Sequence, residues 1–220
     1  MQTLALVAQK GGSGKTTLAV HLAVAAGESG ERVALADTDP QRSATTWGTA
    51  REGRAPLVAT AAAGDISRVI AAALHDDITL LVVDTAPHAA PDARHVARSV
   101  NAVLIPCRPS AFDLAAVERA VEIVTAAGVP AALVLNACPP RAPEIAEARE
   151  VLSRFGLAVA PVEISERRAF SRAVATGRAV TEFEAHGKAA EEIRALWRWI
   201  AEELLTRTPA ATGAVKGETR

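Results

Sequence analysis

The residues KGGSGKTT, at positions 10–17, follow an apolar segment, 3–8, and open an alanine-rich segment, 15–28. The apolar segment has the pattern of a buried strand, and the alanine-rich segment has the pattern of a helix. Glycines let backbone N–H groups turn inward around phosphate oxygens, and the N-terminus of the following helix adds partial positive charge. This order therefore predicts a loop that binds the phosphates of a nucleotide. The alternative is a glycine-rich turn that binds no ligand.

Separate tasks are predicted for the residues of this phosphate loop. Lys15 is expected to neutralise the terminal phosphates, and the hydroxyl of Thr16 is expected to bind Mg²⁺. The other predicted nucleotide contacts come from Gly11, Gly12, Ser13, Gly14 and Thr17.

The start of the loop departs from the usual pattern G-x-x-x-x-G-K-[ST]. The chain has Gln9 where that pattern has its first glycine, and a second lysine, Lys10, precedes the glycines. In families that have this deviant loop, such a lysine points away from the phosphates of its own nucleotide, so a catalytic role for Lys10 requires a second subunit. The alternative is that Lys10 is a solvated loop residue.

Carboxylates follow two of the predicted strands. Asp37 ends the strand 32–37 and opens the segment Asp37-Thr38-Asp39-Pro40-Gln41. Asp84 ends the strand 78–84. The carboxyl ends of parallel strands form the ligand-binding edge of an α/β sheet. A carboxylate as deep as Asp84 needs a partner, which a magnesium-bound water or Lys15 supplies. The alternative for Asp39-Pro40 is that it caps a helix over 41–52.

Short apolar runs alternate with helical segments along the whole chain, which predicts an α/β fold with a doubly wound, mostly parallel sheet flanked by helices. The predicted strands are 3–8, 32–37, 78–84, 102–106, 131–136 and 158–162, with a short edge strand at 57–59. The predicted helices are 15–28, 41–52, 65–75, 91–99, 112–127, 143–155, 167–176 and 188–206. We expect one domain over 1–206 and a flexible polar tail over 207–220.

Composition limits the classes of function. The 220 residues are 50% hydrophobic and 22% charged, which favours a folded chain over a disordered one. With 24 basic and 25 acidic residues the net charge is −1, so binding to DNA or anionic lipid requires a local patch. We find no signal peptide and no apolar run of about 20 residues, which predicts a cytoplasmic protein without a membrane anchor.

The segments KGGSGKTT at 10–17, DTDPQ at 37–41 and LLVVDTAP at 80–87 resemble, in this order, the motifs of the ParA/MinD family of deviant Walker ATPases. The resemblance covers 1–205. The length and the short N-terminus are most similar to the small ParA-type DNA-partition ATPases that lack an N-terminal DNA-binding domain. It implies a P-loop NTPase fold of the deviant Walker A type, with ATP and Mg²⁺ as cofactors.

The resemblance also implies roles for residues. Lys10 is expected to reach across the interface of an ATP-dependent homodimer into the partner's site, and Asp39 to position or deprotonate the attacking water. Asp37 is expected to support the Mg²⁺ shell together with Thr16 and Asp84. Asn136 matches a position whose amide contacts adenine; the alternative is an asparagine that ends a strand in a turn.

An arginine segment at 167–178 predicts the DNA-binding surface. It holds four arginines and no acidic residue: Arg167, Arg168, Arg172 and Arg178. Residues four apart share one helix face and can contact phosphates without reading bases. The expected function is ParA-type partition of a plasmid or chromosome, in which the protein binds nucleoid DNA non-specifically and a ParB-like or adaptor protein stimulates slow ATP hydrolysis. The alternative is a solvated cationic face paired with nearby glutamates.

Other functions remain open in the sequence. One is a MinD-like, membrane-associated regulator; the helix 188–206 carries an apolar stripe, but we expect that stripe to pack inside the protein. A second is a ParA-like positioner of a protein cargo, and a third is a metabolic enzyme of the same ATPase superclass. Cys107 and Cys138 are expected to be small buried residues and not ligands of an iron–sulfur cluster.

Overall fold

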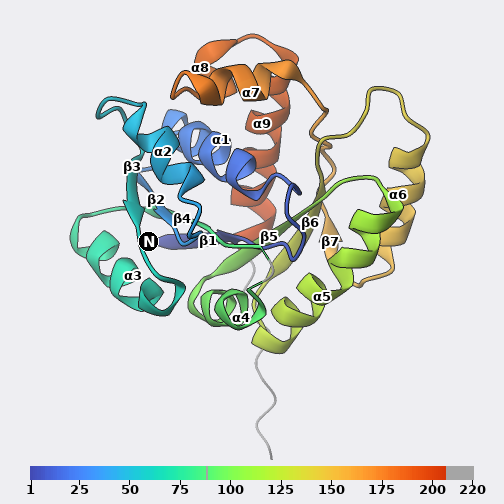
Figure 1. Cartoon of the computed structure of the whole chain (residues 1–220), viewed down its shortest axis with the longest axis horizontal. Coiled ribbons are helices and arrows are strands. Elements are labelled where there is room, and N and C mark those ends of the chain that lie inside the picture. The colour runs from blue at the N-terminus through green and yellow to red at the C-terminus, as the bar shows by residue number, and fades with distance from the viewer. Residues whose placement is uncertain (88, 207–220) are drawn as a thin grey trace, which may run out of the picture.

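Seven parallel strands form one sheet in the computed structural model, which describes residues 1–87 and 89–206 (Figure 1). The strand order is β3-β2-β4-β1-β5-β6-β7, and each neighbouring pair runs parallel. The strands are β1 (Gln2–Leu6), β2 (Val33–Asp37), β3 (Leu57–Thr60), β4 (Leu80–Asp84), β5 (Ala102–Cys107), β6 (Ala131–Leu135) and β7 (Ala158–Val159). The doubly wound α/β prediction is confirmed. The predicted tail, 207–220, lies outside the described residues.

Helices cover both faces of the sheet (Figure 1). One face carries α1 (Lys15–Glu28), α2 (Ser43–Thr49), α7 (Arg168–Ala175), α8 (Val180–Phe183) and α9 (Lys188–Trp199). The other carries α3 (Ile66–His75), α4 (Ala90–Ser99), α5 (Ala111–Ala127) and α6 (Glu144–Ser153). A 3₁₀ turn, Ala63–Asp65, precedes α3, and a π-helical turn, Ile200–Leu204, continues α9.

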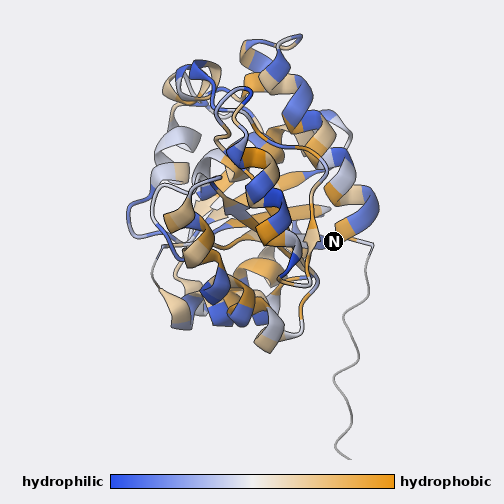
Figure 2. Ribbon diagram, turned by 90° about the vertical axis from the view of Figure 1, so that its right-hand side faces the viewer, coloured by the Kyte–Doolittle hydropathy of each residue, from blue (hydrophilic) through white to orange (hydrophobic). Residues whose placement is uncertain are grey.

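The strands separate two hydrophobic cores. Successive side chains of a strand point to opposite faces, so Leu4 and Leu6 pack beneath α1 while Ala5 and Val7 pack on the other side. The strands inside the molecule are mainly apolar in colour, and polar colours lie on the outer helices (Figure 2). Burial on both faces explains why these strands read as continuous apolar runs.

Two predicted elements have wrong boundaries, and one element was not predicted. The strand 158–162 is only two residues long, and Pro161, which has no N–H group, lies just beyond it. The helix 41–52 begins at Ser43, because Arg42 has the left-handed φ of 55°. The sequence pattern also missed the short helix α8.

The apolar stripe of the C-terminal helix faces the core. Its residues Leu196, Trp197, Ile200 and Leu204 are buried in the same cluster as α1. This confirms that the stripe packs inside the protein. Within 1–87 and 89–206, every helix is too short or too polar to cross a bilayer.

Candidate functional site

The phosphate loop connects β1 to α1 at the carboxyl edge of the sheet. Gly12 and Gly14 have φ values of 79° and 92°, in the left-handed region that side chains other than glycine rarely adopt. A Cβ on Gly14 would lie 2.1 Å from the Nδ2 atom of Asn136. Gly14 is therefore required by both its backbone conformation and its neighbour.

The first turn of α1 is open to an anion. Its N-cap, Gly14, provides no side-chain cap for the first N–H groups of the helix. Lys15 is buried beside them, and burial lowers the pKa of its ammonium group, partly offset by the charges of Asp84 and Asp39. The hydroxyl of Ser13 is buried without a hydrogen-bond partner among the described residues. These features fit the phosphates of a nucleotide.

Thr16 and Asp84 lie together as a magnesium site requires. The Thr16 hydroxyl donates to Asp84 Oδ2 at 2.6 Å. Burial raises the pKa of Asp84 to about 7, with a further raising effect from Asp37 and lowering effects from Thr16 and Lys15. The other carboxylate oxygen, Oδ1, is buried and has no hydrogen-bond partner in the part of the chain described. A hydroxyl beside an unpartnered buried carboxylate oxygen fits Mg²⁺ or its bound water.

Asp37 holds the neighbouring loop in place. Its Oδ1 accepts from the Asp39 N–H at 3.1 Å, and its Oδ2 accepts from the Thr45 N–H and hydroxyl at 2.8 and 2.9 Å. Asp37 is paired in register with Asp84 on the adjacent strand. Its role in the magnesium shell stays a prediction, and the contacts show that it also anchors the start of α2.

Asp39 does not cap α2. That helix starts at Ser43 with Arg42 as its N-cap, and Asp39 Oδ1 instead accepts from the Gln41 N–H at 2.9 Å. Asp39 is half-buried and close enough to lift the pKa of Lys15. The capping alternative is wrong, and the role in positioning water stays a prediction.

Asn136 braces the phosphate loop from β6. Its amide donates to the Ser13 carbonyl at 2.8 Å. It also lines an open pocket that continues from the loop, together with Gly14, Thr17, Arg108 and residues 164–168. A pocket in this position fits the base and sugar of a nucleotide. Contact of Asn136 with adenine stays a prediction.

The four arginines of the predicted DNA surface have different environments. Arg167 is half-buried and pairs with Glu192 at 2.7 Å. Arg168, Arg172 and Arg178 are exposed, and none of the three forms an ion pair within 1–87 and 89–206. Arg172 stacks over the ring of Phe183 at 5.3 Å. Arg167 and Arg168 also line the nucleotide pocket. Pairing with a glutamate, which the alternative expects, is seen at Arg167. Contact of the four arginines with DNA stays a prediction.

The ammonium group of Lys10 is paired with a carboxylate that is distant in the sequence. Its Nζ lies 2.8 Å from Oδ2 of Asp113, at the start of α5. Sequence reasoning missed this pair, because the two residues are 103 positions apart. The Ser110-x-x-Asp113 pattern marks a helix N-terminus and nothing more.

The cysteines are buried and free. Burial raises the pKa of both thiols, Cys107 and Cys138, to about 12. At neutral pH they are therefore protonated thiols.

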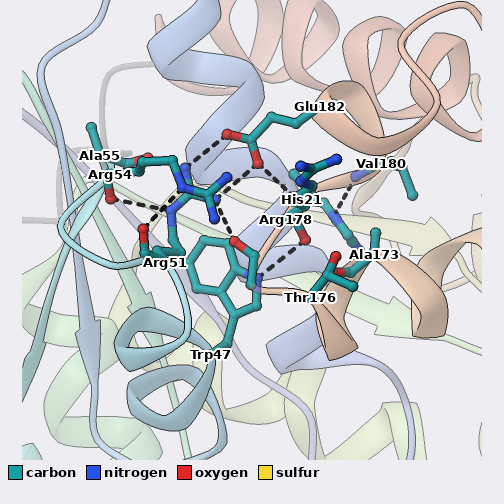
Figure 3. Close-up of polar contacts among 12 residues, drawn as sticks. His21, Trp47, Arg51, Arg54, Ala55, Ala173, Thr176, Arg178, Val180 and Glu182 are labelled. Carbon is teal, nitrogen blue, oxygen red and sulfur yellow. Dashed lines mark hydrogen bonds and ion pairs between the residues drawn. The ribbon is translucent and has the colours of Figure 1, made fainter.

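Arg51 anchors the far end of α2 to the arginine segment (Figure 3). It is 1% exposed, and its guanidinium makes two 2.9 Å bonds to the carboxylate of Glu182. It also donates to the carbonyls of Gly177, Arg54 and Ala55. Burial would raise the pKa of Glu182, but the hydrogen bonds from Arg51 and Ala179 outweigh it and lower that pKa.

Trp47 reinforces this anchor. The Arg51 guanidinium lies 4.6 Å from its ring centre, and its indole N–H donates to the carbonyl of Arg178 at 3.2 Å (Figure 3). Gly177 passes so close that a Cβ on it would lie 2.3 Å from the carbonyl oxygen of Ala50. Sequence reasoning missed this cluster because its partners are 131 residues apart.

Arg51→Met is expected to lower the free energy of unfolding by about 3 kcal/mol, because it leaves Glu182 and three carbonyls without their donor. Denaturant unfolding measures this change. The matched control is Arg68→Met: Arg68 pairs with Asp65 but is 88% exposed, so its change is expected to stay below about 0.5 kcal/mol. Equal losses in the two variants would contradict a structural role for the buried pair.

The chain matches the CobQ/CobB/MinD/ParA nucleotide binding domain family, CbiA, over residues 4–180. The match spans the phosphate loop, both aspartate-bearing strand ends and the arginine segment. The chain belongs to this family. The resemblance to ParA/MinD proteins is thereby confirmed. ParA and MinD proteins are ATPases, and ATP with Mg²⁺ fits the residues of the site.

Relatives with a similar sequence include two bacterial proteins. The maintenance of carboxysome distribution protein A of Gloeobacter kilaueensis is 34% identical over 92% of this chain and 94% of its own length. Protein ParA of Rhizobium radiobacter is 33% identical over 51% of each chain. Among solved structures, Pyrococcus horikoshii MinD complexed with Mg-ADP superimposes with a TM-score of 0.75 at 17% identity, covering 91% of this chain and 96% of that one. This last similarity confirms the fold.

Proposed function

We propose that this chain is a ParA-type positioning ATPase that forms a homodimer on binding ATP, binds DNA without reading its sequence, and releases DNA after hydrolysis. The observation that carries the proposal is the position of Lys10. It belongs to the phosphate loop, yet its ammonium group lies against Asp113 and not at the phosphates of its own chain. We infer that a charge so placed acts on a phosphate of another subunit, as an arginine finger does.

In this proposal the chain's own residues divide the chemistry of hydrolysis to ADP and phosphate. The N–H groups of the loop and the ammonium of Lys15 hold the phosphates. Thr16 and Asp84, with support from Asp37, would hold Mg²⁺, which neutralises phosphate charge when bound. Asp39 orients or deprotonates the attacking water. Because Lys10 arrives from the partner, hydrolysis is slow in the monomer and couples to dimer assembly.

The favoured cargo is a protein assembly. The relative from Gloeobacter kilaueensis matches along nearly its whole length and is named for carboxysome distribution. A bacterial microcompartment with its adaptor protein is therefore the first cargo to test. The second candidate is partition of a plasmid or chromosome through a ParB-like protein, which the match to half of Rhizobium radiobacter ParA supports. Both place the protein in the cytoplasm on the nucleoid.

Arg168 and Arg172 are the best candidates for DNA contact, with Arg178 nearby. Both are exposed and lie one turn apart on α7, and Arg168 also borders the nucleotide pocket. Two cations on one helix face can bind successive phosphates. The Arg51–Trp47 cluster fixes Arg178 to α2, which starts beside Asp37.

The test is binding of the purified protein to duplex DNA of arbitrary sequence with Mg²⁺ and either ATP or ADP. Binding is expected only with ATP. The double variant Arg168→Ala, Arg172→Ala is expected to lower the DNA affinity about tenfold and the slope of its salt dependence by about 2.

The matched control changes Arg94 and Arg98, two exposed arginines four apart on α4, across the sheet from α7. Changing both to alanine is expected to leave DNA binding unaltered. Equal losses in the two double variants would place the DNA surface elsewhere. Equal binding with ATP and ADP would contradict nucleotide control.

A further inference from the structure

The ion pair between Lys10 and Asp113 joins two parts of the chain with different surroundings. The Lys10 side chain is 40% exposed, whereas the Asp113 side chain is 8% exposed. Asp113 lies in the first turn of α5, where the helix dipole favours a negative charge, and its Oδ2 also accepts a hydrogen bond from the Ser110 hydroxyl. The preceding residue, Phe112, is 84% exposed, so the pair lies at the surface of the molecule.

Movement of Lys10 into a partner's site would break this pair. Asp113 would then remain nearly buried, with the Ser110 hydroxyl and the helix N-terminus as its remaining stabilisation. A buried carboxylate that loses its cation is destabilised, because no other charge replaces the lost one. Phosphate oxygens in the partner's site can replace the negative charge that Lys10 loses, but they supply no positive charge to Asp113. The pair therefore favours the unpartnered state.

We propose that Asp113 is a positioning residue that holds Lys10 on its own subunit and sets how readily ATP drives dimerisation. This inference rests on the proposed ATP-dependent dimer. Asp113 touches neither nucleotide nor metal in it. It acts through Lys10, so that the cation stays away from any phosphate until a second subunit docks and the ion pair opens.

The test compares wild type with Asp113→Asn, which keeps the side-chain shape and removes the charge. Sedimentation equilibrium of the full chain with Mg²⁺ and a non-hydrolysable ATP analogue gives the dimer dissociation constant. Asp113→Asn is expected to lower that constant about tenfold, because two Lys10–Asp113 ion pairs must break to form each symmetric wild-type dimer. The control, Asp65→Asn, removes the carboxylate of an exposed ion pair and is expected to change nothing.

A purely structural role is separated by repeating the change in a Lys10→Ala background. The ion pair requires Lys10, so Asp113→Asn is expected to leave the dimer dissociation constant unchanged in that background. A capping role of Asp113 in α5 would change the constant equally in both backgrounds. A second variant, Asp113→Ser, also removes the charge and is used if the asparagine variant does not fold. If wild type dimerises and neither variant has a lower dimer dissociation constant, the inference about Asp113 is overturned and the proposed function stands. Absence of any dimer in wild type would overturn the proposed function with it.

Discussion

Lys15→Ala is expected to lower the affinity for ATP at least about 100-fold. Lys15 is buried at the first turn of α1, where its charge interacts with Asp84 and Asp39. Its loss removes the cation for the phosphates and leaves two carboxylates facing them. Charge-assisted hydrogen bonds contribute about 1.5–3 kcal/mol each, so the loss of two of them, about 3–6 kcal/mol, corresponds to this change in affinity.

Titration calorimetry with ATP and Mg²⁺ measures the effect. The matched control is Lys188→Ala, because Lys188 is an exposed lysine at the start of α9. That variant is expected to bind ATP as wild type does. Unchanged ATP affinity in a folded Lys15→Ala protein would reject the phosphate-loop assignment.

Asp39→Ala is expected to bind ATP and to hydrolyse it at least about 100-fold more slowly. Asp39 is half-buried at the end of β2, and it is tied to the loop through the Gln41 N–H and not to any helix end. A positioned general base contributes about 10²–10⁴-fold to the rate, so its removal leaves binding intact and stops turnover. The ATP-bound dimer is then expected to accumulate.

The rate of phosphate release tests the slower hydrolysis, and gel filtration in ATP tests the accumulation of the dimer. Asp76→Ala is the control, since Asp76 is an exposed aspartate at the end of α3. It is expected to hydrolyse ATP at the wild-type rate. Rapid phosphate release by Asp39→Ala would assign the water-positioning role to another residue.

The parts of the candidate site that depend on residues adjacent in the chain were predictable from the sequence. A glycine-rich turn between a strand and a helix predicts a phosphate loop, and aspartates at the ends of parallel strands must meet at one edge of the sheet. The structure confirms this geometry: Thr16 bonds Asp84, and Asp37 is in register with Asp84. Periodicity was less informative at short elements, since α2, α8 and β7 are too brief to show a repeat.

The sequence by itself determined the fold class, the phosphate loop and the sheet edge that carries the aspartates, because each follows from neighbours in the chain. Only the tertiary structure decided which charges meet. Lys10 contacts Asp113 at a separation of 103 residues, Asn136 braces Ser13 at 123, and Arg51 pairs with Glu182 at 131. A periodic pattern reports which face of an element is buried. The partner on that face depends on how strands are ordered and helices are layered, which no local pattern encodes.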